Sequence, residues 1–296
     1  MGEGRGVFPG TCWAIVDGGR VVASHDADLL VPWWSFTKTV LAAAALTLVR
    51  DGALPLDAAL PGRPYTLRQL LQHRSGLTNY GELAAYHAAV ASGDEPWSFE
   101  ELCGQLDADR LLYEPGHRWH YSNIGYAFVA RLIEEHLQLP LDSALRQCVL
   151  RPLGIEGARV AATPEDLNGV TMGAAGYHPG WVYHGLLVGT VAEAALLLHR
   201  LFEGPLLPDA LRDEIATPFC LPGPIPGRPW IQPGYGLGIM CGEMTAGSVA
   251  GHTGGGPGST IAVYRALSAS GRTAAVFRTA EDQGITEGQA LGLLHG

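Results

Sequence analysis

Ser35 and Lys38 stand three residues apart at the head of an apolar run that ends at Val49. In the first turn of a helix, this spacing brings both side chains to one face. A lysine in an apolar cleft loses its proton more easily and can accept the proton of the serine hydroxyl. The Ser35 N–H lacks a partner within the helix and can face a developing oxyanion. The spacing predicts a lysine-activated serine nucleophile; a capping serine beside a solvated lysine is the alternative.

Two further polar segments follow along the chain. Tyr121-Ser122-Asn123 comes after a Pro-Gly turn and opens a segment whose apolar residues recur at helical spacing. His252 begins the run HTGGGPG, which stands between two strand-like runs over residues 235–241 and 259–264. The chain therefore contains the motifs S-x-x-K, Y-x-N and H-T-G, in that order.

This ordered set resembles the serine hydrolases of the β-lactamase and penicillin-binding-protein superfamily, in particular the class C β-lactamase-like branch with its esterases and D-aminopeptidases. Further stretches that are similar to landmarks of that branch are residues 66–77, 115–116, 151–155 and 235–238. The resemblance covers most of the chain, from residue 32 to residue 264.

The resemblance implies a role for each motif residue. Ser35 would attack a carbonyl group and form an acyl-enzyme. Lys38 would deprotonate Ser35, and Tyr121 would move a proton between the nucleophile and the leaving group. Because Lys38 and Tyr121 would titrate as a coupled pair, either could be the effective base. Asn123 would hold Lys38 and the substrate's carbonyl or amide group, although helix capping also explains this residue.

The third motif departs from many β-lactamases, which have lysine where this chain has His252. Lysine gives a β-lactam carboxylate a permanent positive charge, whereas histidine becomes charged only near pH 6.5. Histidine here is similar to D-aminopeptidase-like and esterase-like relatives, so we expect weak β-lactamase activity at most. Gly254 and Gly255 are expected to bind substrate and oxyanion, with the Gly255 N–H as second oxyanion donor. A plain glycine-rich turn is the alternative.

Aromatic and histidine side chains outside the motifs give weaker signals. Trp33 and Trp34 immediately precede Ser35 and are candidates for the pocket wall, but core packing explains them nearly as well. Histidines cluster over residues 117–120 and 177–184, where no carboxylate completes a metal-binding set. We expect no metal and no cofactor.

Composition narrows the class of protein. With 296 residues and 47% hydrophobic content, the chain can form one large or two closely packed domains. A net charge of −10, with 19 basic residues that form no run, argues against a nucleic-acid or anionic-membrane surface. The apolar stretch over residues 40–49 is about half the length of a membrane helix. Five scattered cysteines without a C-x-x-C pair indicate reduced, buried thiols.

The pattern predicts an α+β fold with a five-stranded antiparallel sheet flanked by helices and an inserted all-helical lobe, and the resemblance implies that this fold is of the β-lactamase/transpeptidase type. The expected strands are a hairpin over residues 11–25 and strands over 236–241, 259–266 and 273–278. Expected helices include the nucleophile helix, 191–202 and 287–294, with capping boxes at Ser98 and Thr190. The sheet domain would comprise residues 1–62 and 182–296, and the mostly helical domain residues 63–181, with the active site at their interface.

The N-terminal segment departs from the family, whose members usually carry a helix before the first strand. Glycines and a proline within residues 4–9 disfavour a helix, so the sheet is expected to expose a face through which a homodimer can form. An early Glu3 and the lack of an apolar core indicate no secretory signal, which predicts a cytoplasmic location.

Together these observations favour a metal-independent serine hydrolase that forms an acyl-enzyme on Ser35 and acts on a small ester or amide. An esterase is favoured over a D-amino-acid amidase or aminopeptidase, and both over a weak β-lactamase. The expected partner is a small-molecule substrate, not a nucleic acid or a membrane. The alternative from another class is a non-catalytic ligand-binding or assembly homologue, which the Trp33-Trp34 pair and the short N-terminus suggest.

Overall fold

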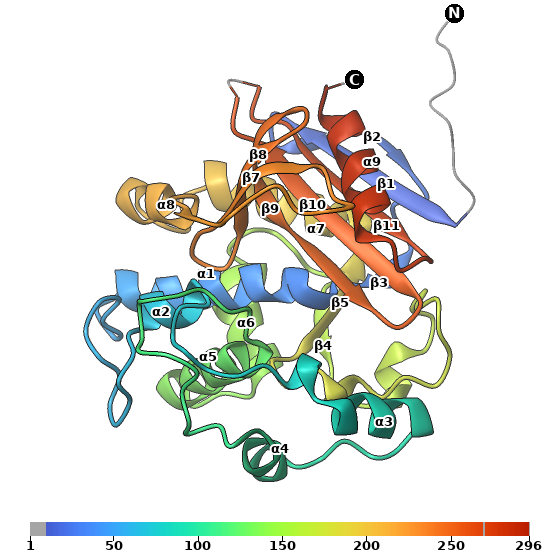
Figure 1. Ribbon diagram of the computed structural model, residues 1–296. Helices are drawn as coiled ribbons and strands as arrows, with labels where there is room; N and C mark the ends of the chain where they lie inside the picture. Colours follow the sequence, from blue (N-terminus) through green and yellow to red (C-terminus); the bar gives the residue numbers. More distant parts are fainter. Residues whose placement is uncertain (1–9, 269, 296) are drawn as a thin grey trace, which may run out of the picture.

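The main element of the fold is a large antiparallel sheet. The computed structural model describes residues 10–268 and 270–295. Its main strands are β1 Thr11–Asp17, β2 Arg20–His25, β6 Phe219–Cys220, β7 Trp230–Tyr235, β8 Met240–Met244, β9 Gly247–Gly256, β10 Ser259–Ala266 and β11 Thr273–Arg278. They form one sheet in the order β2-β1-β11-β10-β9-β8-β7-β6, with every neighbouring pair antiparallel (Figure 1).

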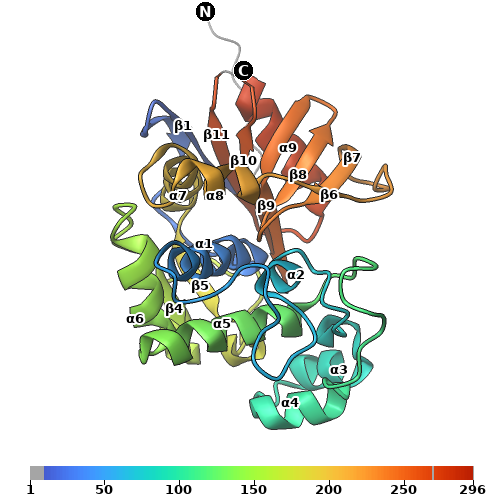
Figure 2. The ribbon, with the colours of Figure 1, turned by 90° about the vertical axis from the view of Figure 1, so that its left-hand side faces the viewer.

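Both faces of the sheet centre are covered by helices. Helix α7, Val191–Glu203, packs on one face and α9, Gln283–His295, on the other (Figure 2). Strand β10 is buried at every position, because successive side chains point to opposite faces. Ile261 and Val263 join the core on the α7 side, whereas Ala262 and Tyr264 join the core under α9.

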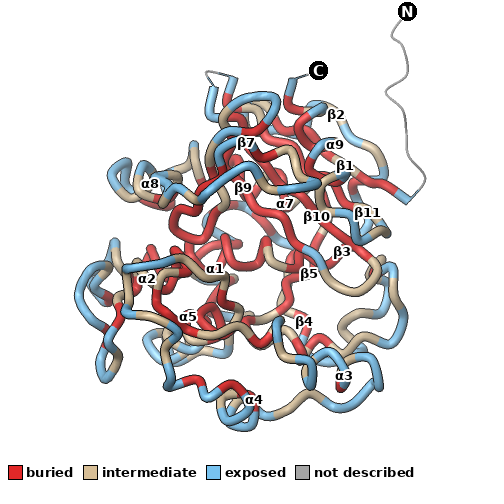
Figure 3. The backbone as a smooth tube through the Cα atoms, viewed as in Figure 1, coloured by how far each residue is buried: buried red, intermediate tan, exposed pale blue. Residues whose placement is uncertain are grey.

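Helix α1, Thr37–Arg50, lies between the sheet and the helical part of the molecule, where it is almost wholly buried (Figure 3). Four consecutive alanines, residues 42–45, favour the helix and let neighbouring elements approach it closely. The helix ends at Arg50 with Asp51 as its C-cap, and Gly52 follows with a φ of +73°, a backbone conformation that glycine adopts easily.

Helices α3 to α6 form the layer below α1 in Figure 1, and α2 lies beside α1. Their bounds are α2 Leu67–Leu71, α3 Ala84–Ser92, α4 Phe99–Leu106, α5 Asn123–Leu137 and α6 Leu141–Leu145, with α8 Asp209–Ile215 beside the sheet. Short helical turns cover Trp34–Phe36, Tyr80–Glu82, Arg146–Leu150, Pro164–Leu167 and Pro179–Trp181. The capping boxes expected at Ser98 and Thr190 are both formed, at the starts of α4 and α7.

A small second sheet connects the two parts of the molecule. It consists of β3 Leu30–Pro32, β4 Arg159–Ala161 and β5 Leu186–Thr190, in the order β3-β5-β4. Strand β4 comes from the expected helical domain and pairs with β5 of the expected sheet domain. The division into residues 1–62 with 182–296 and residues 63–181 stays a prediction.

The α+β fold class is confirmed, but the expected count of five strands is wrong, because the main sheet has eight strands among the described residues. Most of the expected strand over residues 236–241 is the turn between β7 and β8, where Gly238 has a φ of +76°. Conversely, the run His252 to Gly256 lies within β9 and not between strands. Glycine has low strand propensity, so this strand is held by backbone pairing with β10 and not by its side chains.

Three further expectations concern the N-terminal segment, the cysteines and membrane-spanning helices. The expectation for the N-terminal segment falls largely on residues 1–9, which lie outside the described residues, and the homodimer stays a prediction. All five cysteines are free, as expected, but Cys220 is exposed rather than buried. Within the described part of the chain, no helix has the length and apolar character needed to cross a membrane.

Substitution of Gly238 can test how closely the turn between β7 and β8 packs on α1. A Cβ at this position would lie 2.2 Å from the Ala42 Cβ and 3.1 Å from the Lys38 carbonyl oxygen. Gly62 has a similar φ of +69° but open space around it. We expect Gly62→Ala to cost about 1–2 kcal/mol of unfolding free energy from its backbone conformation alone. Gly238→Ala should cost at least about 1–3 kcal/mol more through overpacking, as measured by urea unfolding. Equal losses would contradict the close packing.

Candidate active site

Ser35 lies in the helical turn Trp34–Phe36, directly before α1. Trp34 has a φ of +42°, which is unusual for a residue with a bulky side chain and stores backbone strain. The Phe36 N–H donates to the Trp33 carbonyl (2.8 Å), and the Trp34 indole N–H donates to the Ser259 hydroxyl (3.0 Å). These bonds hold the turn in place, so that Ser35 is partly exposed while both its neighbours are buried.

Lys38 projects from the first turn of α1 toward Ser35. Its Nζ lies 3.1 Å from the Ser35 Oγ, and the residue is fully buried. Burial holds the pKa of Lys38 well below its usual value of 10.5. Within the described residues, no ion pair joins Lys38 to a carboxylate that would oppose this shift. The amine is therefore suited to accept a proton at neutral pH.

Sequence composition contains a signal about this amine that motif reading overlooks. Lys38 is the only lysine in the chain, and every other member of the 19 basic residues is arginine. Arginine stays protonated at any accessible pH, whereas a buried lysine can become neutral. The one lysine thus lies where a proton acceptor is needed.

Tyr121 also lies close to Ser35 and Lys38. The Lys38 Nζ lies 5.0 Å from the centre of the Tyr121 ring, which packs against the His73 ring at a tilt, with the ring centres 4.2 Å apart. Ser122 anchors the segment: its N–H donates to the His73 Nδ1 (3.0 Å) and its hydroxyl caps α5. Burial raises the pKa of Tyr121 well above 10, and a hydrogen bond with Ser35 offsets part of that rise. The phenol therefore keeps its proton where Lys38 has lost its own.

The glycines of the third motif differ in position. A Cβ at Gly254 would lie 2.7 Å from the Ser35 nitrogen and 2.8 Å from the Trp33 carbonyl oxygen. Only glycine lets β9 approach the backbone of the nucleophile turn this closely. Gly255, the next residue, lines the cleft, whereas Gly254 does not.

His252 is buried and makes hydrogen bonds with both ring nitrogens. Its Nδ1 lies 2.8 Å from the Thr253 carbonyl oxygen, which can only accept, so Nδ1 carries the proton. Its Nε2 then accepts from the Tyr235 hydroxyl at 2.8 Å. Burial, with a contribution from Lys38, lowers the pKa of His252 to about 3. The expectation that His252 becomes charged near pH 6.5 is therefore wrong: it is a neutral ring that faces Tyr235 and does not line the cleft.

His184 is the residue that motif analysis missed. Its Nε2 lies 3.2 Å from the Lys38 Nζ, and its Nδ1 lies 3.4 Å from the Tyr80 hydroxyl. Asn123, expected to hold Lys38, makes no hydrogen bond to it among the described residues; its side chain lines the cleft, and its N–H donates to the Asn79 side chain. The sequence shows only a histidine within the cluster over residues 177–184, for which we expect no metal.

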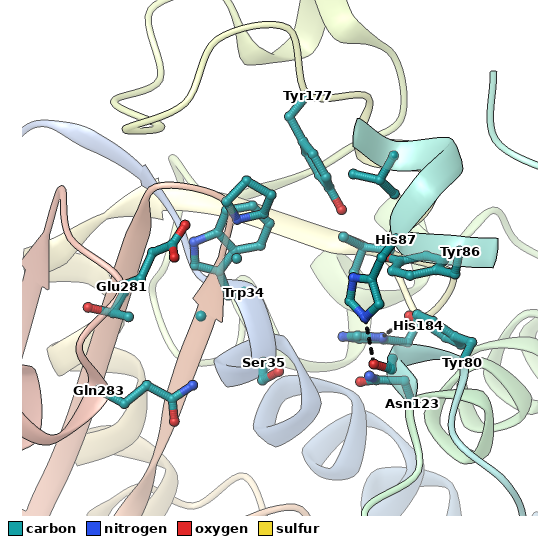
Figure 4. A pocket seen from close by; sticks show the side chains of 17 residues that line it. Trp34, Ser35, Tyr80, Tyr86, His87, Asn123, Tyr177, His184, Glu281 and Gln283 are labelled. Atoms are coloured by element: carbon teal, nitrogen blue, oxygen red, sulfur yellow. Dashed lines mark hydrogen bonds between the residues drawn. The ribbon is translucent and has the colours of Figure 1, made fainter. Parts of the chain in front are cut away.

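Of the site residues, Ser35, Tyr80, Asn123, His184 and Gly255 line a cleft of about 490 Å³, whereas Lys38 and Tyr121 lie behind its lining. In Figure 4, Ser35 lies between Glu281 and Gln283 on one side and Tyr80, His184 and Asn123 on the other, with Trp34 and Tyr177 above it. Trp33 does not contribute to the pocket, contrary to expectation. It is fully buried and packs on Phe36 and Gly189 in the core, because the chain turns sharply between the two tryptophans.

Comparison with known proteins identifies the family. Residues 2–290 match the family model described as Beta-lactamase. The chain belongs to the β-lactamase family. The D-aminopeptidase of Brucella anthropi is 26% identical over 83% of this chain and 51% of the relative. The esterase EstB of Burkholderia gladioli is 31% identical over 52% of this chain and 43% of the relative. The chain spans about half or less of the length of these curated relatives.

Solved structures with the same fold agree along nearly the whole chain. A D-stereospecific amidohydrolase from Streptomyces sp. superposes with a TM-score of 0.79 at 24% identity, covering 96% of this chain and 92% of that one. The D-amino acid amidase from Ochrobactrum anthropi SV3 gives a TM-score of 0.78 at 22% identity over the same shares. At these identities, the likeness shows the β-lactamase-type fold alone.

A buried ion pair lies behind the third motif of this β-lactamase-family site, on the α9 side of the sheet. Glu287 on α9 is completely buried and pairs with Arg228. Its carboxylate also accepts hydrogen bonds from the Thr253 hydroxyl and from the Trp230 indole N–H. An uncompensated charge at this depth would be costly, so Arg228 keeps the Glu287 carboxylate in place, and the Thr253 hydroxyl links β9 to it. In the described residues, no group of three or more His, Cys, Asp or Glu side chains is arranged to hold a metal ion.

The lowered pKa of Lys38 predicts a measurable pH dependence of stability. Between the folded pKa and about 10.4, the unfolded chain binds a proton at Lys38 that the folded protein does not, so the unfolding free energy rises with pH. Lys38→Met removes this titration. We expect the variant to be more stable than the wild type at pH 7, with an advantage that shrinks by up to about 1.4 kcal/mol per pH unit toward pH 9. Urea unfolding of both proteins at these two pH values measures it. A constant difference would mean that the pKa of Lys38 is not lowered.

Proposed function

We propose that the protein is a serine hydrolase that cleaves a small ester or amide through an acyl-enzyme on Ser35. The observation that carries this proposal is the 3.1 Å contact between the Lys38 Nζ and the Ser35 Oγ. Burial without a carboxylate partner favours the neutral amine, which can accept the proton of the hydroxyl. Membership of the β-lactamase family supports it.

Acylation begins when the Ser35 Oγ bonds to the substrate's carbonyl carbon and its proton passes to the Lys38 Nζ. The carbonyl oxygen becomes an oxyanion, which the N–H groups of Ser35 and Gly255 would bind. Gly255 lines the cleft, and its neighbour Gly254 lies against the Ser35 nitrogen, so both amides lie close to the reacting carbon. Each such donor is worth about 10²–10³ in rate.

The leaving group needs a proton, and Tyr121 is the residue suited to give it. Its raised pKa keeps the phenol protonated, and it lies against both Ser35 and Lys38. As the carbon–nitrogen or carbon–oxygen bond breaks, the phenol protonates the departing atom, and the proton held by Lys38 restores the phenol. Water then attacks the acyl-enzyme by the same steps in reverse order. This assignment makes Lys38 the base and Tyr121 the acid.

The comparisons support esters and amides equally as substrates. One relative is named an esterase and another a D-aminopeptidase, so the preference for esters drawn from sequence has no further support. A β-lactam is less well matched, because its carboxylate would find a neutral His252 where lysine stands in many β-lactamases.

Removal of the Ser35 hydroxyl tests this proposal. Ser35→Ala should abolish hydrolysis of p-nitrophenyl butyrate and should prevent labelling by a fluorophosphonate probe, read as an intact-mass shift of one adduct. Ser92→Ala, at an exposed serine at the end of α3, is the matched control and should behave as wild type. Equal turnover and labelling of wild type and Ser35→Ala would refute the proposal and favour a non-catalytic homologue.

A second candidate is an amidase for acyl groups that carry an ammonium, such as amino-acid amides. Among the described residues that line the cleft, Glu281 is the one carboxylate, and none is an arginine or a lysine. The Glu281 carboxylate accepts from the Gly258 N–H (2.9 Å), which orients it at the cleft rim opposite Tyr80 and His184 (Figure 4). A cationic substrate thus finds an attractive charge, and an anionic one finds none.

Glu281→Gln tests this candidate. For a D-amino-acid p-nitroanilide with a free amino group, we expect KM to rise by up to about fivefold, as an exposed charge pair of about 1 kcal/mol implies. The N-acetylated counterpart should be unaffected, and added salt should reduce the difference. Glu95→Gln, an exposed carboxylate outside the cleft lining, is the control. An equal effect on both substrates would reject Glu281 as the ammonium partner.

A further inference from the structure

Among the described residues, His184 makes the one hydrogen-bond contact of the Lys38 amine that the proposed mechanism does not yet use. It lies in the loop before β5 and is 3% exposed. Its Nε2 is 3.2 Å from the Lys38 Nζ, and its Nδ1 is 3.4 Å from the Tyr80 hydroxyl. A chain of contacts therefore runs from Ser35 through Lys38 and His184 to Tyr80.

The geometry of a neutral amine explains why such a contact matters. A neutral lysine carries two N–H groups and one lone pair on Nζ, and only the lone pair can accept the Ser35 proton. Rotation about the last carbon–nitrogen bond offers three staggered orientations, of which one points the lone pair at the Ser35 Oγ. An acceptor placed elsewhere around Nζ engages an N–H and favours that orientation.

We propose that His184 is a positioning residue for the Lys38 base: its Nε2 accepts an N–H of the neutral amine and thereby keeps the lone pair of Nζ directed at the Ser35 Oγ. This inference rests on the proposed serine hydrolase function. It requires the proton of the ring to sit on Nδ1, where the Tyr80 oxygen accepts it. The Tyr80 hydroxyl lies 3.4 Å from Nδ1 and can accept that proton, so this tautomer is compatible with the contact.

The same contact remains useful after the proton has moved. The Lys38 ammonium then has three N–H groups, which meet the Ser35 oxygen, the His184 Nε2 and the face of the Tyr121 ring, 5.0 Å away. The proton that left Ser35 stays on Nζ, and none has to pass to His184. The histidine stabilises the ammonium as an acceptor.

The surroundings keep His184 in the form that can accept. The titratable groups that face it are Lys38 on α1 and Tyr80 in the turn Tyr80–Glu82, with His252 on β9 and His73 farther away. Burial, followed by the positive charges that these lysine and histidine side chains can carry, holds the pKa of His184 well below its usual 6.5. The ring is neutral wherever the enzyme would work.

The test compares His184→Leu, which removes the acceptor, with His184→Gln, whose amide can accept from Lys38 and donate to Tyr80. With p-nitrophenyl butyrate, we expect kcat to fall about tenfold or more in His184→Leu, with KM within about threefold of wild type. His184→Gln should recover at least about a third of the wild-type kcat. His136→Leu, at an exposed histidine on α5, is the control.

The single lysine makes the decisive measurement direct. In protein labelled with ¹³C and ¹⁵N at lysine, the one side-chain signal reports the titration of Lys38. Without the acceptor the ammonium is less stable, so the pKa of Lys38 and the acid limb of kcat/KM should both move to lower pH in His184→Leu and stay in place in His184→Gln. Unchanged kcat and an unchanged titration in a folded His184→Leu would overturn the inference.

Two further outcomes separate the possible failures. If His184→Leu does not fold, Tyr80→Phe removes the acceptor of the Nδ1 proton: a lower kcat with a shifted acid limb supports the inference, and wild-type behaviour overturns it. If Ser35→Ala retains full activity, the proposed function fails. If Ser35→Ala is inactive while His184→Leu matches wild type, the positioning role alone is lost.

Discussion

The desolvation of one amine is the constraint on which the rest of the site depends. Lys38 lies wholly buried with no carboxylate partner among the described residues, so its neutral form is favoured. An arginine could not take its place, since the guanidinium does not release its proton, and a solvated lysine would stay charged. The alanine-rich helix α1 serves this purpose: small side chains let β9, α5 and the β7–β8 turn pack around the amine and exclude water.

Placing a nucleophile beside that amine costs backbone strain, which the surroundings must offset. Trp34 adopts a left-handed conformation so that Ser35 faces the cleft, and Gly254 brings a strand against the Ser35 nitrogen. Both features depend on the position of β9. The buried pair of Glu287 and Arg228, with the hydroxyl of Thr253 bonded to it, ties that strand to α9. The ion pair lies outside the cleft, yet it fixes the geometry within it.

Sequence alone predicted the α+β fold and brought together three motifs from distant parts of the chain. It could not predict contacts made by single residues without a motif. His184 meets Lys38 across 146 positions, and a lone histidine gives no sign of such a partner. Nor could pattern reveal that the glycine run is a strand, since its pairing comes from the backbone of β10. The charge of His252 was misjudged because burial, which sequence shows poorly, decides its pKa.

The titratable side chains around the amine also constrain one another. Lys38, His184, His252 and His73 are all buried close together, so a proton on any one of them raises the cost of a proton on the others. Burial keeps Tyr121 protonated, so it does not supply a negative charge that would offset a positive charge on one of these groups. Burial therefore disfavours the charged form of each group, and a proton is best held by the group whose contacts best accommodate a cation. Lys38, with an oxygen, a ring nitrogen and an aromatic face around it, is that group.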